Sequence, residues 1–341
     1  MTTPRTLVAA FDAFLDFKAG KSVNTLRAYR NDFASIAALV SQNLDRPIED
    51  LTVADVLDKY VLRPAFGTFA TTRSRASMHR CWSTWNTFAA FLVGDDILDA
   101  NPMASVEKSS QGEPPGPPKS IEPEEVETML VQLALPDPED VDGWRQRDLA
   151  IVLLGLLLGL RSGELSALNI GDFAPIKDDS GAMTVTVRGK GNKVRVMTAE
   201  ASLIAILEIY LKSRIARFPD HVTRAKKGRS RIWSRIEEKE PLLVGADGER
   251  ITRGTLQYRT KRAYRQAGIP SVRGANTHRL RHTFAITLAS EGVPVNVLAG
   301  LLGHSSLNTA LKYLEASGRA TRAATNVNPI YNMADRISPN N

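Results

Sequence analysis

The sequence is short of cysteine and of long apolar runs. Its 341 residues include one cysteine, Cys81. One thiol cannot form an internal disulfide, so we expect a protein of the reducing cytoplasm. The longest apolar stretch, residues 149–160, is shorter than the ~18 residues that a membrane-spanning helix needs. The first residues also lack the apolar core and cleavage site of a secretory signal peptide, so we expect no membrane association and no export.

Acidic residues are absent from Ile251 to Ser290. The first 108 residues hold 12 Lys and Arg and 12 Asp and Glu, so the net charge of +7 comes from the rest of the chain. A one-sided positive field attracts polyanions such as nucleic acid, although many basic surfaces bind nothing. The acid-free stretch contains these basic residues: Arg253, Arg259, Lys261, Arg262, Arg265, Arg273, Arg279 and Arg281.

Two further signatures are missing. No cluster of Asp and Glu suggests a metal site, and no Walker-type glycine-rich loop suggests a bound nucleotide. We therefore expect neither a metal nor a cofactor.

The chain is long enough for two domains, and its composition changes once. Residues 109–120, "SSQGEPPGPPKS", are rich in Pro, Gly and Ser and cannot continue a helix. We therefore predict a domain at 1–108, a linker at 109–120, and a second domain at 121–341.

Hydrophobic periodicity predicts a mainly α protein with a small β-sheet in the second domain. Residues 182–200 alternate Val, Thr and Met around the turn "GKGN", as in a β-hairpin. Residues 144–168 predict a buried helix, a glycine break and a second helix. The other predicted helices are 7–20, 22–40, 51–61, 71–96, 120–133, 199–217, 252–267, 278–291, 294–303 and 306–318.

Some residues could carry chemistry, and each also has a structural explanation. Arg161 follows an apolar run, where a guanidinium needs an anion, and Glu164 could simply be its ion-pair partner. Lys190 lies between two glycines, where it could reach a phosphate or remain a solvated turn residue. His304 and Tyr313 could each be structural, since an isolated tyrosine at helical spacing is usually part of the core.

The hexapeptide "THRLRH", residues 277–282, packs four basic side chains into the start of a helix. Residues three apart are neighbours on a helix, which gives the pairs His278 with Arg281 and Arg279 with His282. One pair could bind an anion while the other is solvated.

The order of these boxes resembles the tyrosine recombinases of the phage-integrase and Xer-type family. "GLRSGEL" is similar to the first arginine box, "GKGNK" to the hairpin lysine, "THRLRHTFA" to the His-x-x-Arg box, and "LLGHSSLNTALKYL" to the histidine and tyrosine box. The resemblance implies a helical core-binding (SAM-like) bundle followed by a catalytic domain. A basic insertion at about 214–240 departs from the family pattern and has no assigned role.

The resemblance implies the roles of the site residues. Arg161, Arg281 and His304 would stabilise a DNA phosphodiester under attack, and Glu164 would orient Arg161 or His278. Tyr313 would be the nucleophile. A phenol has a pKa of about 10 and needs a base, for which His278 is the candidate. Lys190 would protonate the 5′-hydroxyl leaving group. The pair Arg279 and His282 would then lie at the flank.

The resemblance also implies the partners. The substrate would be double-stranded DNA with an inverted-repeat recombination site, bound by a homotetramer near the nucleoid and joined, in some systems, by an accessory or directionality protein. We expect DNA contacts from Arg73, Arg75, Arg80, Arg253, Arg259, Lys261 and Arg279. Two alternatives stay open: a type IB topoisomerase that nicks and reseals one strand, and a catalytically silent DNA-binding protein of the same fold.

Overall fold

The chain divides into two compact units in a computed structural model of the protein. The N-terminal unit is Met1–Pro115 and the C-terminal unit is Gly116–Asn341. The structure describes residues 6–108, 120–136, 143–178, 180–189, 193–221, 232–270, 276–303, 310, 311 and 313. Within these ranges, no helix is both long and apolar enough to cross a membrane.

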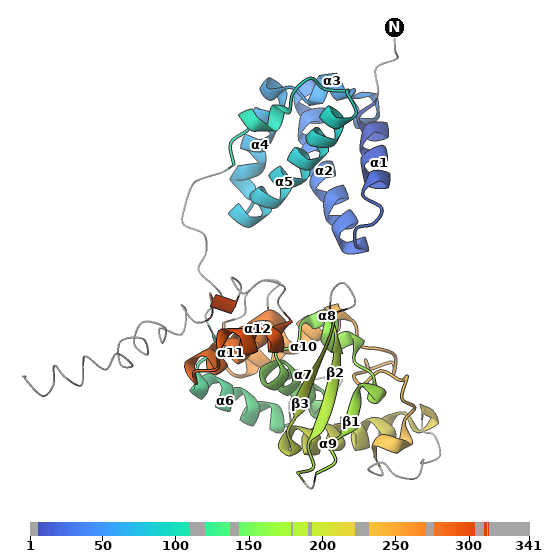
Figure 1. Ribbon diagram of the computed structural model, residues 1–341, viewed down its shortest axis with the longest axis vertical. Coiled ribbons are helices and arrows are strands. Elements are labelled where there is room, and N and C mark those ends of the chain that lie inside the picture. The colour runs from blue at the N-terminus through green and yellow to red at the C-terminus, as the bar shows by residue number, and fades with distance from the viewer. Residues whose placement is uncertain are drawn as a thin grey trace, which may run out of the picture. The chain divides into compact units, whose positions relative to one another are not determined.

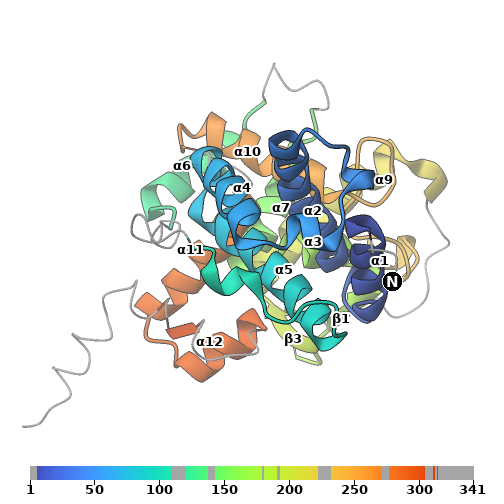
Figure 2. The ribbon, with the colours of Figure 1, turned by 90° about the horizontal axis from the view of Figure 1, so that it is seen from above.

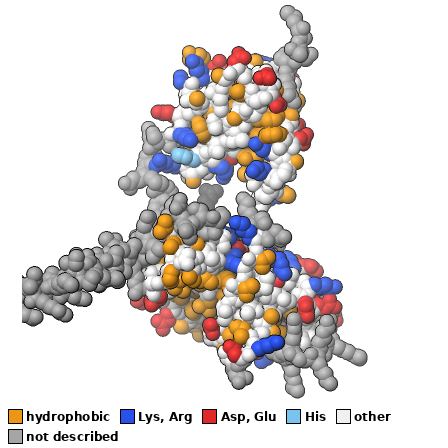
Figure 3. Space-filling model, viewed as in Figure 1, with side chains coloured by type: hydrophobic (Ala, Val, Ile, Leu, Met, Phe, Trp, Pro, Cys, Tyr) orange, Lys and Arg blue, Asp and Glu red, His pale blue; other side chains and the backbone are white. Residues whose placement is uncertain are grey.

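The N-terminal unit is helical in the residues that the structure describes. Its α-helices are α1 (Leu7–Phe17), α2 (Val23–Leu44), α3 (Val53–Val56), α4 (Lys59–Thr72) and α5 (Arg75–Gly94), with 3-10 turns at Ile48–Asp50 and Pro102–Ser105. α2 packs against both α4 and α5 (Figure 1). The core is aromatic: Phe33 stacks on Phe11 at 3.8 Å and on Trp85 at 5.4 Å between ring centroids. On the face that Figure 3 shows, acidic and basic side chains are interspersed over this unit.

Two predicted helices of this unit have different bounds in the structure. The helix predicted at 51–61 ends at Val56, and Asp58 starts α4 by accepting a hydrogen bond from the Tyr60 amide at 2.6 Å. The helix predicted at 71–96 begins only at Arg75, because the Ser74 hydroxyl caps α5. In both places a short polar side chain satisfies free helical amides, and so decides where the helix starts.

The C-terminal unit combines helices with one small sheet. The helices are α6 (Pro123–Ala134), α7 (Arg145–Leu158), α8 (Ser162–Ala167), α9 (Ala201–Arg217), α10 (Arg253–Gln266), α11 (Asn276–Ser290) and α12 (Val295–Leu302). The strands β1 (Phe173–Pro175), β2 (Met183–Arg188) and β3 (Val194–Ala199) form an antiparallel sheet in the order β1-β2-β3. The predicted hairpin is confirmed as β2 and β3, whereas β1 was not predicted.

Helix α7 lies at the centre of this unit. It packs against α6, α9, α10 and α11, and α6 and α10 lie side by side (Figure 2). Leu280 of α11 fills the space beside Gly155, where an added Cβ would lie 2.8 Å from it. The inner face of β2, with Met183, Val185 and Val187, is buried in the same core. This packing holds the ends of α7, α11 and β3 in fixed positions.

The basic insertion predicted at about 214–240 is only partly described. Arg214 belongs to α9, is buried, and donates a hydrogen bond to the carbonyl of Pro241. Trp233 is buried and stacks on Phe173 at 5.1 Å. Arg214 and Trp233 therefore belong to the core of the unit, whereas Arg217, Arg235 and residues 237–239 are exposed. Residues 222–231 lie outside the described residues.

Candidate active site

A tight turn at the end of α7 places Arg161 at the start of α8. Gly159 adopts a left-handed conformation with φ of 56°, and an added Cβ there would lie 2.3 Å from the ring of Phe284. Only glycine combines this conformation with so close a contact. The chain then turns, and Arg161 becomes the residue that precedes α8.

Glu164 is the centre of the site. Its buried carboxylate accepts hydrogen bonds from the backbone amide of Arg161 at 2.9 Å and from Nη1 of Arg161 at 2.9 Å. Arg195 of β3 donates from Nη1 at 3.0 Å and from Nη2 at 2.8 Å. A third guanidinium, that of Arg281, lies 3.8 Å away. The predicted ion pair between Arg161 and Glu164 is therefore present, as one contact of a larger network.

The electrostatics of Glu164 favour its ionised form. Burial alone raises the pKa of a carboxyl group, but hydrogen bonds from Arg195 and from the Arg161 amide outweigh it, and the net pKa is lowered. One carboxylate therefore faces three guanidiniums. This surplus of positive charge would attract an anion with several oxygen atoms, and a phosphodiester has that chemistry.

Arg281 is the most deeply buried of the three guanidiniums around Glu164. The side chain comes from α11 and is fully buried, with Nη1 donating to the carbonyl of Gly159 at 2.7 Å and Nη2 to that of Leu302. Burial, and next the charge of Arg161, lower its pKa to about 10, which still leaves it charged at neutral pH. Arg281 thus links the end of α7 to the end of α12, and its position is fixed before any substrate binds.

Tyr313 lies close to two histidines. Its ring is buried against His282, with 5.3 Å between ring centroids, and His282 contacts His278 at 4.5 Å. Burial raises the pKa of Tyr313, while the positive charges of Arg281 and Arg161 act in the opposite direction. The hydroxyl is therefore protonated at neutral pH, and the ring lies within the electrostatic reach of both guanidiniums.

The two histidines differ in exposure. His278 keeps an exposed surface, but the protein around its ring displaces part of its hydration and lowers its pKa. The positive charges of Arg281 and Arg161 lower this pKa further. It is therefore mostly neutral at neutral pH and can accept a proton. The expectation that Arg279 and His282 lie at a solvated flank was wrong, because both are buried and His282 lies between His278 and Tyr313.

Two predicted site residues, Lys190 and His304, lie outside the described residues. Their neighbours are described. Gly189 donates its amide to the carbonyl of Lys193 at 2.8 Å across the hairpin turn. Gly303 ends α12 with φ of 59°, and its carbonyl accepts a hydrogen bond from Nη2 of Arg161 at 3.4 Å.

The basic residues of the C-terminal unit that were predicted to contact DNA are of two kinds, exposed and buried. Arg253 and Lys261 of α10 are exposed. Arg259 is buried and pairs with Asp148 at 3.4 Å. Arg279 is buried and donates to the carbonyls of Pro270 and Ser120. These internal contacts correct the prediction for Arg259 and Arg279, which we assign to the fold rather than to DNA.

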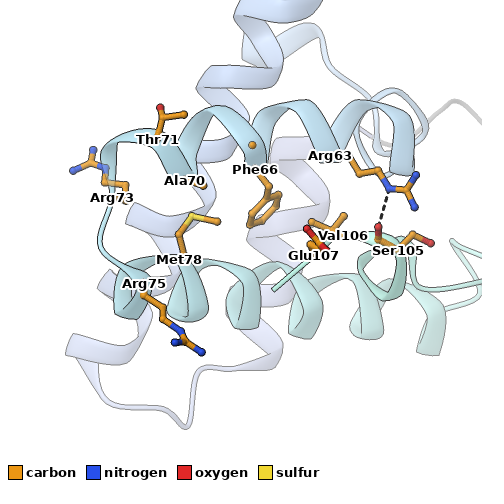
Figure 4. A pocket seen from close by; sticks show the side chains of 11 residues that line it. Arg63, Phe66, Ala70, Thr71, Arg73, Arg75, Met78, Ser105, Val106 and Glu107 are labelled. Atoms are coloured by element: carbon orange, nitrogen blue, oxygen red, sulfur yellow. Dashed lines mark hydrogen bonds between the residues drawn. The ribbon is translucent and has the colours of Figure 1, made fainter. Parts of the chain in front are cut away.

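Two of the three predicted DNA contacts of the N-terminal unit, Arg73 and Arg75, lie at one end of a hollow of about 950 Å³ that α4, α5 and residues 105–107 line. Phe66 and Met78 lie between this end and the other, where Arg63 and Glu107 are found (Figure 4). The end with Arg73 and Arg75 has the charge to contact a phosphate backbone. Elsewhere in this unit, Arg80 is half exposed but forms a two-pronged pair with the buried Asp32.

Sequence reasoning missed Arg195. The residue lies in β3, five positions after Lys190, and the period-2 alternation of a strand places it on the same face as the buried Met197 and Ala199. This alternation was the signal that could have separated Arg195 from its exposed neighbours. Within the described residues, no cluster of three His, Cys, Asp or Glu side chains could hold a metal ion.

Known proteins resemble this chain over most of its length. The sequence model of the Phage integrase family matches residues 119–319. The chain is 29% identical over 318 residues to the tyrosine recombinase XerC of Myxococcus xanthus, covering 93% of this chain and 95% of the relative.

Two solved structures show a similar fold. The XerH site-specific recombinase bound to a palindromic difH substrate aligns with a TM-score of 0.66 at 19% identity, covering 89% of this chain and 79% of that chain. A lambda integrase tetramer bound to a Holliday junction aligns with a TM-score of 0.63 at 15% identity, covering 92% and 78%. At these identities the likeness supports the architecture alone.

Proposed function

Because the chain belongs to the phage integrase family, we propose that it is a site-specific DNA recombinase that cuts and rejoins strands through a 3′-phosphotyrosyl intermediate. The structural observation that supports this proposal most strongly is the arrangement of side chains around Glu164. Arg161 and Arg281 converge there, and Tyr313 lies within reach of both charges. A nucleophilic hydroxyl beside paired guanidiniums suits an attack on a phosphodiester.

The residues would divide the work as follows. Arg161 and Arg281 would neutralise the charge that grows on the non-bridging oxygens, with His304 as a further donor. The Tyr313 oxygen would bond to phosphorus and pass its proton to His278, which is neutral at working pH. The P–O bond to the 5′-oxygen would break, and that oxygen would take a proton from Lys190. A second 5′-hydroxyl would reverse these steps on the partner strand.

Recombination of two duplexes needs four such sites, so we propose that four copies assemble on DNA. The lambda integrase tetramer on a Holliday junction gives a precedent in a protein of the same fold. The DNA site would carry inverted repeats, and an accessory or directionality protein and a nucleoid location belong to the same proposal. Arg73, Arg75, Arg253 and Lys261 would contact the backbone, since their charges lie on the exposed or half-buried surface.

A nicked DNA substrate tests the nucleophile. The short strand beyond the cut diffuses away, so the covalent adduct accumulates and can be measured on a denaturing gel. Tyr313→Phe should abolish the adduct and leave DNA binding unchanged, because only the hydroxyl is lost. Tyr258→Phe, at an exposed tyrosine of α10, is the matched control and should form the adduct normally. An adduct with Tyr313→Phe would exclude Tyr313.

The two alternatives give different products. A type IB topoisomerase would relax a supercoiled plasmid carrying two target sites without exchanging them, whereas a recombinase would also yield deleted or inverted circles. A catalytically silent DNA-binding protein would retard the target fragment and form no adduct. The family match and the complete set of candidate residues favour the recombinase.

A further inference from the structure

Arg195 is the least expected part of the site. Its neighbours in β3, Val194 and Val196, are exposed on the outer face of the sheet, while the Arg195 side chain turns inward and is only 11% exposed. Both terminal nitrogens bind the Glu164 carboxylate, at 3.0 Å and 2.8 Å. A two-pronged pair of this kind fixes orientation as well as distance.

A second observation places Arg195 against the end of α12. A Cβ added to Gly303 would lie 3.0 Å from Nη1 of Arg195, so this glycine leaves room for the guanidinium. Nε of Arg195 is buried and has no hydrogen-bond partner among the described residues. Burying a donor without a partner is unfavourable, so the two-pronged contact with Glu164 must compensate for it.

The hairpin register connects Arg195 to the turn. Arg195 pairs with Val187 across the hairpin, and Arg188 pairs with Val194. The Gly189 amide then closes the turn on the carbonyl of Lys193. Lys190 follows Gly189 in the sequence, three residues after Val187, the partner of Arg195 across the hairpin.

We propose that Arg195 is a positioning residue that locks the β2–β3 hairpin to Glu164, and that proton transfer from Lys190, which follows β2 in the sequence, to the leaving 5′-oxygen depends on this lock. The inference rests on the proposed function, since it assumes that Lys190 protonates this oxygen. Glu164 belongs to α8 and Arg161 directly precedes this helix, whereas Lys190 lies between β2 and β3 in the sequence. Arg195 gives the described residues a direct ion pair between these two elements.

A change of leaving group tests this role. When sulfur replaces the bridging 5′-oxygen at the scissile phosphate, the thiolate leaves without a proton, and a misplaced general acid no longer matters. On ordinary DNA, Arg195→Gln should slow adduct formation by about 100-fold, the lower range for a lost general acid. On the sulfur-containing DNA, the variant should come within about threefold of the wild-type protein, because the remaining groups are still in place.

Two further variants sharpen the result. Arg188→Gln removes a charge from the same hairpin, but Arg188 pairs with Asp172 and not with Glu164, so it should behave like wild type on both DNAs. Arg195→Lys keeps the charge but not the two-pronged geometry. It should show the same difference between substrates to a smaller degree, and it carries the test if Arg195→Gln fails to fold.

The outcomes separate the inference from the proposed function. A wild-type protein that forms no Tyr313 adduct on either DNA overturns the proposed function. A wild-type adduct together with Arg195 variants that are equally slow on both DNAs overturns the inference, because the defect would then lie in the arginine cluster or in folding. Variants with normal rates on ordinary DNA also overturn it.

Discussion

The two units bury charge to very different extents. In the described N-terminal unit the buried charged side chain is Asp32, whose carboxylate accepts hydrogen bonds from Arg80 and Thr84. The C-terminal unit buries six arginines in its described part: Arg147, Arg214, Arg259, Arg262, Arg279 and Arg281. Removing a guanidinium from water is unfavourable unless anions and carbonyls surround it, so the second unit carries a penalty that the first avoids.

The balance of charge around the buried carboxylate also differs between the two units. Around Asp32 one carboxylate meets one guanidinium, whose other side is exposed to water. Around Glu164 one carboxylate meets three guanidiniums, and the imbalance can be relieved by a phosphate. The N-terminal pair balances its charges within the fold, whereas the C-terminal cluster has a surplus of positive charge that, in the proposed function, the DNA phosphate would neutralise.

The largest effect should come from removing the two carboxylates. Glu164→Ala should lower the free energy of unfolding of the C-terminal unit by about 3–5 kcal/mol, because Arg281 and Arg195 stay buried without their anion. Asp32→Ala should lower that of the N-terminal unit by only about 1–3 kcal/mol, because Arg80 can turn to water. Hydrogen exchange of amides in α7 and α2 reports each unit separately. Equal losses would contradict the comparison.

The next effect concerns one guanidinium of the cluster. Arg161→Ala should slow adduct formation by about 100- to 1,000-fold, the usual result of losing one transition-state donor. The fold should survive, since the side chain is partly exposed. Arg145→Ala is the control, because Arg145 is exposed and its Nη1 donates a hydrogen bond to the carbonyl of Ala134 at 3.2 Å, away from the site. A loss below about threefold for Arg161→Ala would remove Arg161 from the reaction.

A smaller effect follows from the lowered pKa of His278. In the proposed mechanism the neutral form of His278 accepts the tyrosine proton, so the cleavage rate should be flat near pH 7 and fall only below the ordinary histidine value of 6.5. Below the lowered pKa the rate should drop about tenfold per pH unit, as for a single essential base. His278→Gln should be slow at every pH and lack this acid limb. Single-turnover adduct formation between pH 5 and 8 measures it, and an unchanged limb in the variant would exclude His278 as the base.

The smallest effect distinguishes exposed from buried arginines. Arg73→Ala should weaken DNA binding modestly and reduce the slope of log affinity against log salt by about 1, as for one phosphate contact. Arg279→Ala should leave that slope unchanged and lower the unfolding free energy instead, because Arg279 holds backbone carbonyls inside the unit. Binding titrations at several salt concentrations decide between them. A reduced slope for Arg279→Ala would restore it to the DNA surface.

Much of the fold follows from the sequence alone. Periodicity and turn residues gave the glycine break after α7 and the β2–β3 hairpin. The start of α4 was missed because Asp58 competes with a continuous apolar pattern, and a local cap outweighs that pattern. The three-residue strand β1 gives no periodic signal at all.

The sequence predicted the candidate active site only in part. Arg161, Glu164, Arg281 and Tyr313 were predicted from their boxes, and the structure brings them together, although their catalytic roles stay a prediction. The polar character of a side chain did not predict its exposure, because Arg279 and His282 are polar but buried inside the C-terminal unit. The contribution of Arg195 depends on a contact between segments 31 residues apart. Such contacts follow from packing, which a single sequence does not reveal.

The central claim is that Tyr313 becomes esterified to DNA. The most direct measurement is mass spectrometry of the trapped adduct after digestion with protease and nuclease. The account predicts a nucleotide phosphate on the peptide that contains Tyr313 and on no other tyrosine peptide. A modified peptide containing Tyr258, or any residue other than Tyr313, would contradict it.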